Sequence, residues 1–129
     1  MTKSFRATEF SATEETWGYL TVLGAPSTEE EDFYLMLQRP YTYSKDAVQW
    51  GQDKPYIEFC SQGQSWYGHI ASFRLLRDRV LVRMDQTAAS EMGNDGNIEV
   101  IFDLDDKRFA ELKRALHNTF QDVSYFEVV

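Results

Sequence analysis

Residues 67–85, YGHIASFRLLRDRVLVRMD, decide the fold class because they have the pattern of two strands joined by a tight turn. In the second half, Val80, Val82 and Met84 alternate with Arg, Leu and Asp side chains. This period of two places every other side chain on one face of a sheet. The turn is expected at Arg77-Asp78, so the segment predicts an antiparallel hairpin.

Further strands are expected on both sides of this hairpin, since short runs of β-branched and aromatic residues alternate with turn-forming clusters. Their expected positions are residues 17–23 (WGYLTVL), 33–38 (FYLMLQ), 56–60 (YIEFC), 98–103 (IEVIFD) and 125–129 (YFEVV). In the fourth of these, Ile98, Val100 and Phe102 share one face.

One helix is expected, over about residues 106–120, because apolar side chains recur there at spacings of three and four. The stripe consists of Phe109, Leu112, Leu116 and Phe120, and Asp105 is the expected N-cap. Together these elements predict an α+β fold that is mostly β: a twisted antiparallel sheet packed against one C-terminal amphipathic helix. Residues 1–129 are expected to form a single domain.

The composition excludes several classes of function. Thirteen basic and 21 acidic residues give a net charge of −8, which disfavours binding to nucleic acid. No apolar stretch approaches the roughly 20 residues that cross a bilayer, and the N-terminus lacks a secretory signal pattern. The single cysteine, Cys60, is typical of a reducing compartment, so we expect a cytoplasmic protein that does not bind membranes.

Candidate catalytic groups have ordinary structural interpretations. Cys60 lies in a strand-like run without a neighbouring base, so a buried structural thiol is expected. His69 is expected on a strand face with Tyr67, Ala71 and Phe73, as a hydrogen-bonded imidazole, and His117 near a helix end. No spacing typical of a metal site or a nucleotide-binding loop is present. We therefore expect no catalytic residues, no metal and no cofactor.

The segment 39–55, RPYTYSKDAVQWGQDKP, is longer than most loops of compact domains and carries Tyr41, Tyr43 and Trp50. Ser44 is positioned to cap one short helical turn. Two interpretations remain open: the aromatic side chains pack inward as a satellite core, or they contact a partner. Trp66 has the same two interpretations, and burial in the core is the stronger one.

The order of these segments resembles the immunity protein 10 family of bacterial polymorphic toxin systems over about residues 30 to 120. The resemblance rests on YLMLQR at 34–39, YIE at 56–58, GHIASFRL at 68–75, VLV at 80–82 and IEVIF at 98–102. It implies a small, mostly β, cytosolic protein that binds and blocks a cognate toxin domain and has no activity of its own. The resemblance does not indicate which residues of this chain contact the toxin.

An enzyme is the third and weakest hypothesis, which a cleft converging on His69 with a carboxylate within hydrogen-bond reach would support. Two other functions precede it. The first is an intracellular immunity protein that neutralises a cognate toxin domain, for which a basic nuclease is one candidate because its field would complement the charge of −8. The second is a non-catalytic binding module for a small molecule or peptide, using a concave sheet face and the aromatic residues. The residues expected to bind the partner are Glu29, Glu30, Glu31, Asp32, Tyr41, Tyr43, Trp50 and Trp66.

Overall fold

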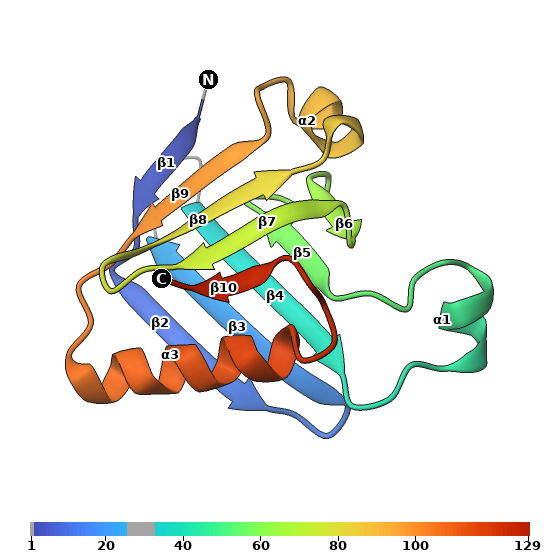
Figure 1. Ribbon diagram of the computed structural model, residues 1–129, viewed down its shortest axis with the longest axis horizontal. Helices are drawn as coiled ribbons and strands as arrows, with labels where there is room; N and C mark the ends of the chain where they lie inside the picture. The colour runs from blue at the N-terminus through green and yellow to red at the C-terminus, as the bar shows by residue number, and fades with distance from the viewer. Residues whose placement is uncertain (1, 26–32) are drawn as a thin grey trace.

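The strands form two five-stranded sheets in the computed structural model, which describes residues 2–25 and 33–129 (Figure 1). The first sheet contains, in spatial order, β1 (Lys3–Arg6), β9 (Asn97–Ile101), β8 (Arg79–Met84), β7 (Ile70–Leu75) and β10 (Phe126–Val128). The second contains β2 (Glu9–Glu14), β3 (Gly18–Ala25), β4 (Phe33–Pro40), β5 (Tyr56–Phe59) and β6 (Ser65–Tyr67). The helices are α1 (Lys45–Gln49), α2 (Gln86–Met92) and α3 (Asp106–Thr119).

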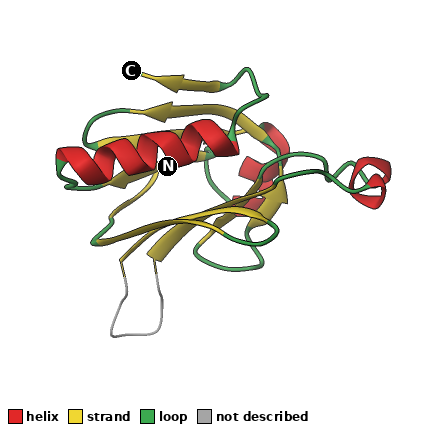
Figure 2. Ribbon diagram, turned by 90° about the horizontal axis from the view of Figure 1, so that it is seen from below, coloured by secondary structure: helices red, strands yellow, loops and turns green. Residues whose placement is uncertain are grey.

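The first sheet and α3 lie on the same side of the second sheet (Figure 2). Helix α3 packs against β2, β3 and β4, and the inner faces of both sheets contribute to one hydrophobic core. The other face of the second sheet is left uncovered by these elements. The expected α+β class, dominated by β, is confirmed, with its strands divided between two sheets.

Pairing within the second sheet is antiparallel throughout the described residues, as expected. The first sheet is mixed, because its two edge strands pair in parallel: β1 with β9, and β10 with β7. Both of these pairs join segments that are far apart in the chain. The prediction of a purely antiparallel sheet is therefore wrong at these two edges.

The predicted hairpin is present as β7 and β8, and its second strand buries the three residues expected to face inward. The first strand is shorter than predicted. Gly68 and His69 have positive φ angles of 79° and 60°, and at this point the chain leaves β6 and enters β7 of the other sheet. His69 therefore does not share a strand face with Tyr67 and Phe73; its exposed ring makes a 2.8 Å hydrogen bond with Asp85.

Helix α3 begins and packs as its sequence predicts. The Asp105 carboxylate accepts a hydrogen bond of 2.8 Å from the backbone N–H of Arg108, and Leu112 and Leu116 are fully buried. Phe109 is only half-buried, and the guanidinium of Arg77 covers its ring at 4.6 Å. We therefore expect a smaller loss of stability on truncating Phe109 than on truncating a fully buried aromatic residue.

Helix α2 is absent from the sequence-based prediction. Asp85 caps it by accepting a hydrogen bond of 3.0 Å from the N–H of Ala88, and Gly93 ends it in the left-handed conformation with φ of 72°. This pair of end signals is visible in the sequence. The alternating pattern that predicts the preceding strand runs on to Asp85, one residue beyond the end of β8, so Asp85 is assigned to a strand instead of a helix cap.

A buried arginine connects the second sheet to the C-terminal segment. Arg39, at the end of β4, donates hydrogen bonds to both carboxylate oxygens of Asp122, the Nη2 bond being 2.9 Å, and its guanidinium lies 5.0 Å from the centre of the Tyr43 ring. The side chain of Arg39 is almost fully buried, whereas that of Asp122 is about half-exposed. The hydrogen bond from Arg39 lowers the pKa of Asp122.

Replacing Asp122 by Asn is expected to lower the free energy of unfolding at pH 7 by about 1 to 2 kcal/mol, a value between those of exposed and buried ion pairs. Because the folded-state pKa is lowered, the stabilisation is present above the ordinary pKa of about 4 and is lost as the pH falls. The free energies of unfolding of the unmodified protein and of Asp122→Asn, measured by urea titration, should therefore become equal as the pH is lowered below about 4. Glu127→Gln is the control, since its ion pair with Arg74 is exposed. An equal loss of stability in Asp122→Asn and Glu127→Gln would contradict a stabilising role for the ion pair between Arg39 and Asp122.

Candidate functional site

A groove of about 630 Å³ lies on the uncovered face of the second sheet, beside the base of α1. Its position follows from strand alternation: Leu35 and Leu37 of β4 face the core, so Met36 and Gln38 face outward. On β5, Glu58 pairs with Met36 and Tyr56 pairs with Gln38, so these side chains share the outer face. Trp17, Tyr43, Lys54 and Tyr67 are among the residues that form its walls.

Glu58 is a buried carboxylate on this outer face, with 6% of its surface exposed. The hydroxyl of Tyr56 donates a hydrogen bond of 2.5 Å to Oε1, and the hydroxyl of Tyr34 donates one to Oε2. Burial, and then the hydrogen bond to Glu58, raise the pKa of both tyrosines, so both remain hydroxyl donors at neutral pH. No lysine, arginine or histidine forms an ion pair with Glu58 within the described residues.

The segment between β4 and β5 forms an arm that projects from the sheet and carries α1 near its end (Figures 1 and 2). Ser44 caps α1 by accepting a 3.0 Å hydrogen bond from the N–H of Ala47, which confirms the predicted helical turn. No residue of α1 is buried. Trp50, its C-cap, is 73% exposed and Val48 is 56% exposed, so the arm presents apolar surface to solvent.

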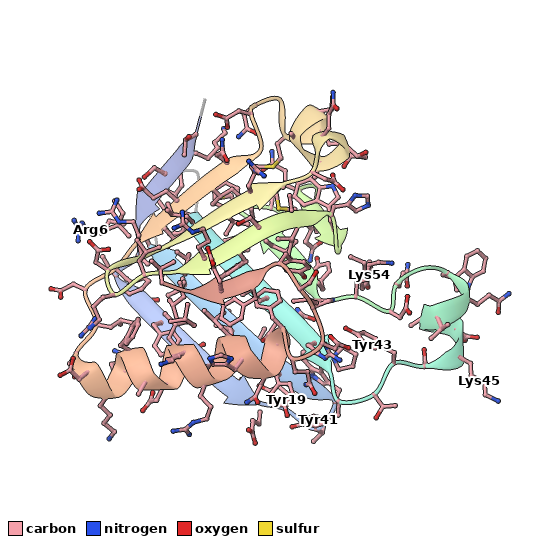
Figure 3. All side chains as sticks on the ribbon, viewed as in Figure 1. Arg6, Tyr19, Tyr41, Tyr43, Lys45 and Lys54 are labelled. Atoms are coloured by element: carbon pink, nitrogen blue, oxygen red, sulfur yellow. The ribbon has the colours of Figure 1, made fainter. Side chains whose placement is uncertain are left out.

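The three aromatic residues predicted in this segment lie in different surroundings. Tyr43 is half-buried and lines the groove, whereas Trp50 is exposed on the arm. Tyr41 is half-exposed; its hydroxyl donates a 2.7 Å hydrogen bond to the carbonyl oxygen of Glu15, and its ring meets Tyr19 edge-on at 5.1 Å. Figure 3 shows Tyr43 and Lys54 on the two segments that join the arm to the sheet, and Lys45 at its far end.

Trp66 is not an exposed interface residue, which corrects its assignment to a partner-binding surface. It lies opposite Ile57 on the core side of β6, only 7% of it is exposed, and its indole N–H donates a hydrogen bond to Glu91 of α2. The acidic group Glu29, Glu30, Glu31 and Asp32 lies outside the described residues. Glu58 was missed by the sequence analysis; the available signal is the Tyr-x-Glu pattern on one face of a predicted strand.

The remaining candidate groups do not assemble into a catalytic or metal site within the described ranges. Cys60 is half-buried, with φ of 65°, which corrects the expected full burial. His117 is exposed in the last turn of α3, with its ring edge-on to Phe126 at 5.3 Å. No three His, Cys, Asp or Glu side chains of the described chain gather as metal ligands. No helix there combines the length and apolar character needed to span a membrane.

Exposed aromatic residues such as Trp50 are enriched at surfaces that bind another protein. The chain matches the family model described as Immunity protein 10 over residues 6–110. The protein therefore belongs to the Immunity protein 10 family. Searches of curated proteins and of solved structures found no match.

Proposed function

We propose that this protein is an intracellular immunity protein that binds a cognate toxin domain and neutralises it by covering its active site. The observation that carries the proposal is the match to the Immunity protein 10 family over residues 6–110. The family suggests a role without catalysis. The uncovered sheet face and the arm then supply the surface for the partner.

The net charge of the chain favours a basic protein partner. The chain carries a net charge of −8, and complementary fields speed the association of oppositely charged proteins. Trp50 offers a large exposed ring of the kind that dominates binding energy at interfaces. A basic nuclease domain fits both features.

The alternative of a small-molecule or peptide module is less well supported. The volume of the groove is within the usual range for ligand pockets. However, only Tyr43 of the four aromatic residues predicted to line such a site does so, while Trp66 is buried and Trp50 lies on the arm. The four predicted aromatic side chains therefore do not converge on one cleft, and the groove is lined by Trp17, Tyr56 and Tyr67 beside Tyr43.

The test uses the toxin domain encoded by the adjacent gene, produced in an inactive form. We expect a stable complex, an association rate that falls as salt is raised, and protection of cells that express the active toxin. A toxin domain from an unrelated system is the control. Failure both to bind any neighbouring gene product and to protect cells would overturn the proposal.

A further inference from the structure

We propose that the groove on the outer face of the second sheet receives an arginine side chain of the toxin, which pairs with the carboxylate of Glu58. This inference rests on the proposed function and deepens it, since it names the place and the chemistry of contact. It is carried by the burial of Glu58, by its hydrogen-bond partners and by the aromatic walls of the groove.

The carboxylate of Glu58 has unused capacity to accept hydrogen bonds. Two carboxylate oxygens together accept about four hydrogen bonds, and the hydroxyls of Tyr34 and Tyr56 supply two. Both donors are neutral, so the negative charge is oriented without being compensated. Burial of a charge without a counter-ion is unfavourable, and a cation entering the groove would remove that cost.

Neither Arg39, on the neighbouring strand β4, nor Lys54, in the groove wall, forms an ion pair with Glu58 in the described part of the chain. Arg39 faces the opposite side of the sheet and binds Asp122. Lys54 lines the groove, but its aliphatic stem lies against Gly68, and it forms no ion pair with Glu58 within the described residues. The carboxylate therefore remains available to a cation supplied from outside the chain.

The walls of the groove favour arginine over lysine. Trp17, Tyr43 and Tyr67 line it, and the Tyr56 ring packs against Tyr67 with centroids 5.2 Å apart. A guanidinium stacks on aromatic faces and donates two parallel hydrogen bonds to a carboxylate, whereas an ammonium is a more strongly hydrated point charge. The protein already shows this chemistry at the base of the arm, where the guanidinium of Arg39 covers the Tyr43 ring and binds Asp122.

The partner is a protein because the groove adjoins the arm. Ser44 and Ala47 at the base of α1 line the groove, and Trp50 and Val48 of the same arm expose apolar surface that a free small cation would leave uncovered. Asp53, on the same arm, acts electrostatically on Tyr43 of the groove wall, so a second carboxylate lies near the groove and complements a basic side chain. An arginine that projects from such a surface would reach Glu58 while its neighbours contact the arm.

The first experiment compares Glu58→Gln with Glu127→Gln in binding to the inactive toxin domain. Glutamine preserves the shape and can still bond both tyrosine hydroxyls, but removes the charge. We expect Glu58→Gln to bind roughly 30-fold or more weakly, with a melting temperature no lower than that of the unmodified protein. Glu127→Gln, on the far edge of the other sheet, should bind within about twofold of the unmodified protein.

The second experiment needs no toxin. N-acetyl-arginine amide should shift the backbone amide resonances of Tyr56, Glu58 and Tyr67 at millimolar concentration, whereas the citrulline analogue, which has the same shape without the charge, should not. Equal shifts with both compounds, or none with arginine, would overturn the inference. Micromolar binding of the free compound would also overturn it, in favour of a small-molecule site.

The outcomes separate the two proposals. If the unmodified protein does not bind the toxin domain, the proposed function fails and the inference about the groove fails with it. If the unmodified protein binds and Glu58→Gln binds equally well, only the assignment of the groove is overturned.

Discussion

Replacing Phe73 by alanine is expected to lower the free energy of unfolding by about 3 to 5 kcal/mol, the range for removing a buried phenylalanine ring. Phe73 is completely buried on the inner face of β7. Its ring lies 4.7 Å from that of Phe120, at the end of α3, and 6.1 Å from that of Phe126 on β10. The variant would therefore leave a cavity where the first sheet meets the C-terminal segment.

Urea denaturation of the variant and of Phe33→Ala would test this expectation. Phe33 is 43% exposed and contacts Phe5 at 5.9 Å, so its truncation should cost only about 1 kcal/mol. For a chain of this size, the loss at Phe73 corresponds to a fall in Tm of very roughly 10 to 20 °C. Equal losses of unfolding free energy in Phe73→Ala and Phe33→Ala would contradict the prediction. They would mean that the core closes around the missing Phe73 ring and leaves no cavity.

The elements that the sequence predicts well are those defined by local periodicity. The alternation of Val80, Val82 and Met84 and the apolar stripe of α3 both identify the buried face correctly, because burial requires those periods. The parallel pairs at the edges of the first sheet have no such signal. They join segments distant in the chain, and nothing in the three residues of β10, for example, specifies β7 as the partner.

In the candidate site, too, local interactions are predictable from the sequence, whereas contacts between distant segments are not. Ser44 and the composition of the long segment predict α1, since capping is a local interaction. The setting of Glu58 depends on pairing between β4 and β5, which brings Tyr34 to its carboxylate from 24 residues away. Trp66 is buried and its neighbour Tyr67 is exposed, because a shift of one residue along a strand changes the face. The sequence alone therefore does not show which of the two rings is exposed, because this depends on the register in which β6 pairs with β5.

The two surfaces of the second sheet have different physical roles. Its inner face packs against α3 and the first sheet, so substitutions there change the free energy of unfolding. Its outer face and the arm contribute little to the core, since no residue of α1 is buried. Substitution of an exposed interface residue on α1 should therefore change binding without changing stability.

Replacing Trp50 by alanine is expected to weaken binding to the toxin domain by at least about 2 kcal/mol, roughly 30-fold, while changing the free energy of unfolding by less than about 0.5 kcal/mol. The ring is 73% exposed and belongs to the C-cap of a helix without buried residues, so its removal creates no cavity. On complex formation the same ring would bury a large apolar area at a small cost in side-chain entropy.

Surface plasmon resonance should show most of this loss as faster dissociation, because substitutions at one interface change the off-rate more than the on-rate. Gln49→Ala is the matched control: it is exposed on the same helix, and alanine preserves helix propensity, so binding should stay within about threefold. Binding by Trp50→Ala at the level of this control would remove the arm from the interface. An early melting transition of Trp50→Ala would instead show that the ring supports the fold, since an exposed ring that only contacts a partner leaves the unfolding transition unchanged.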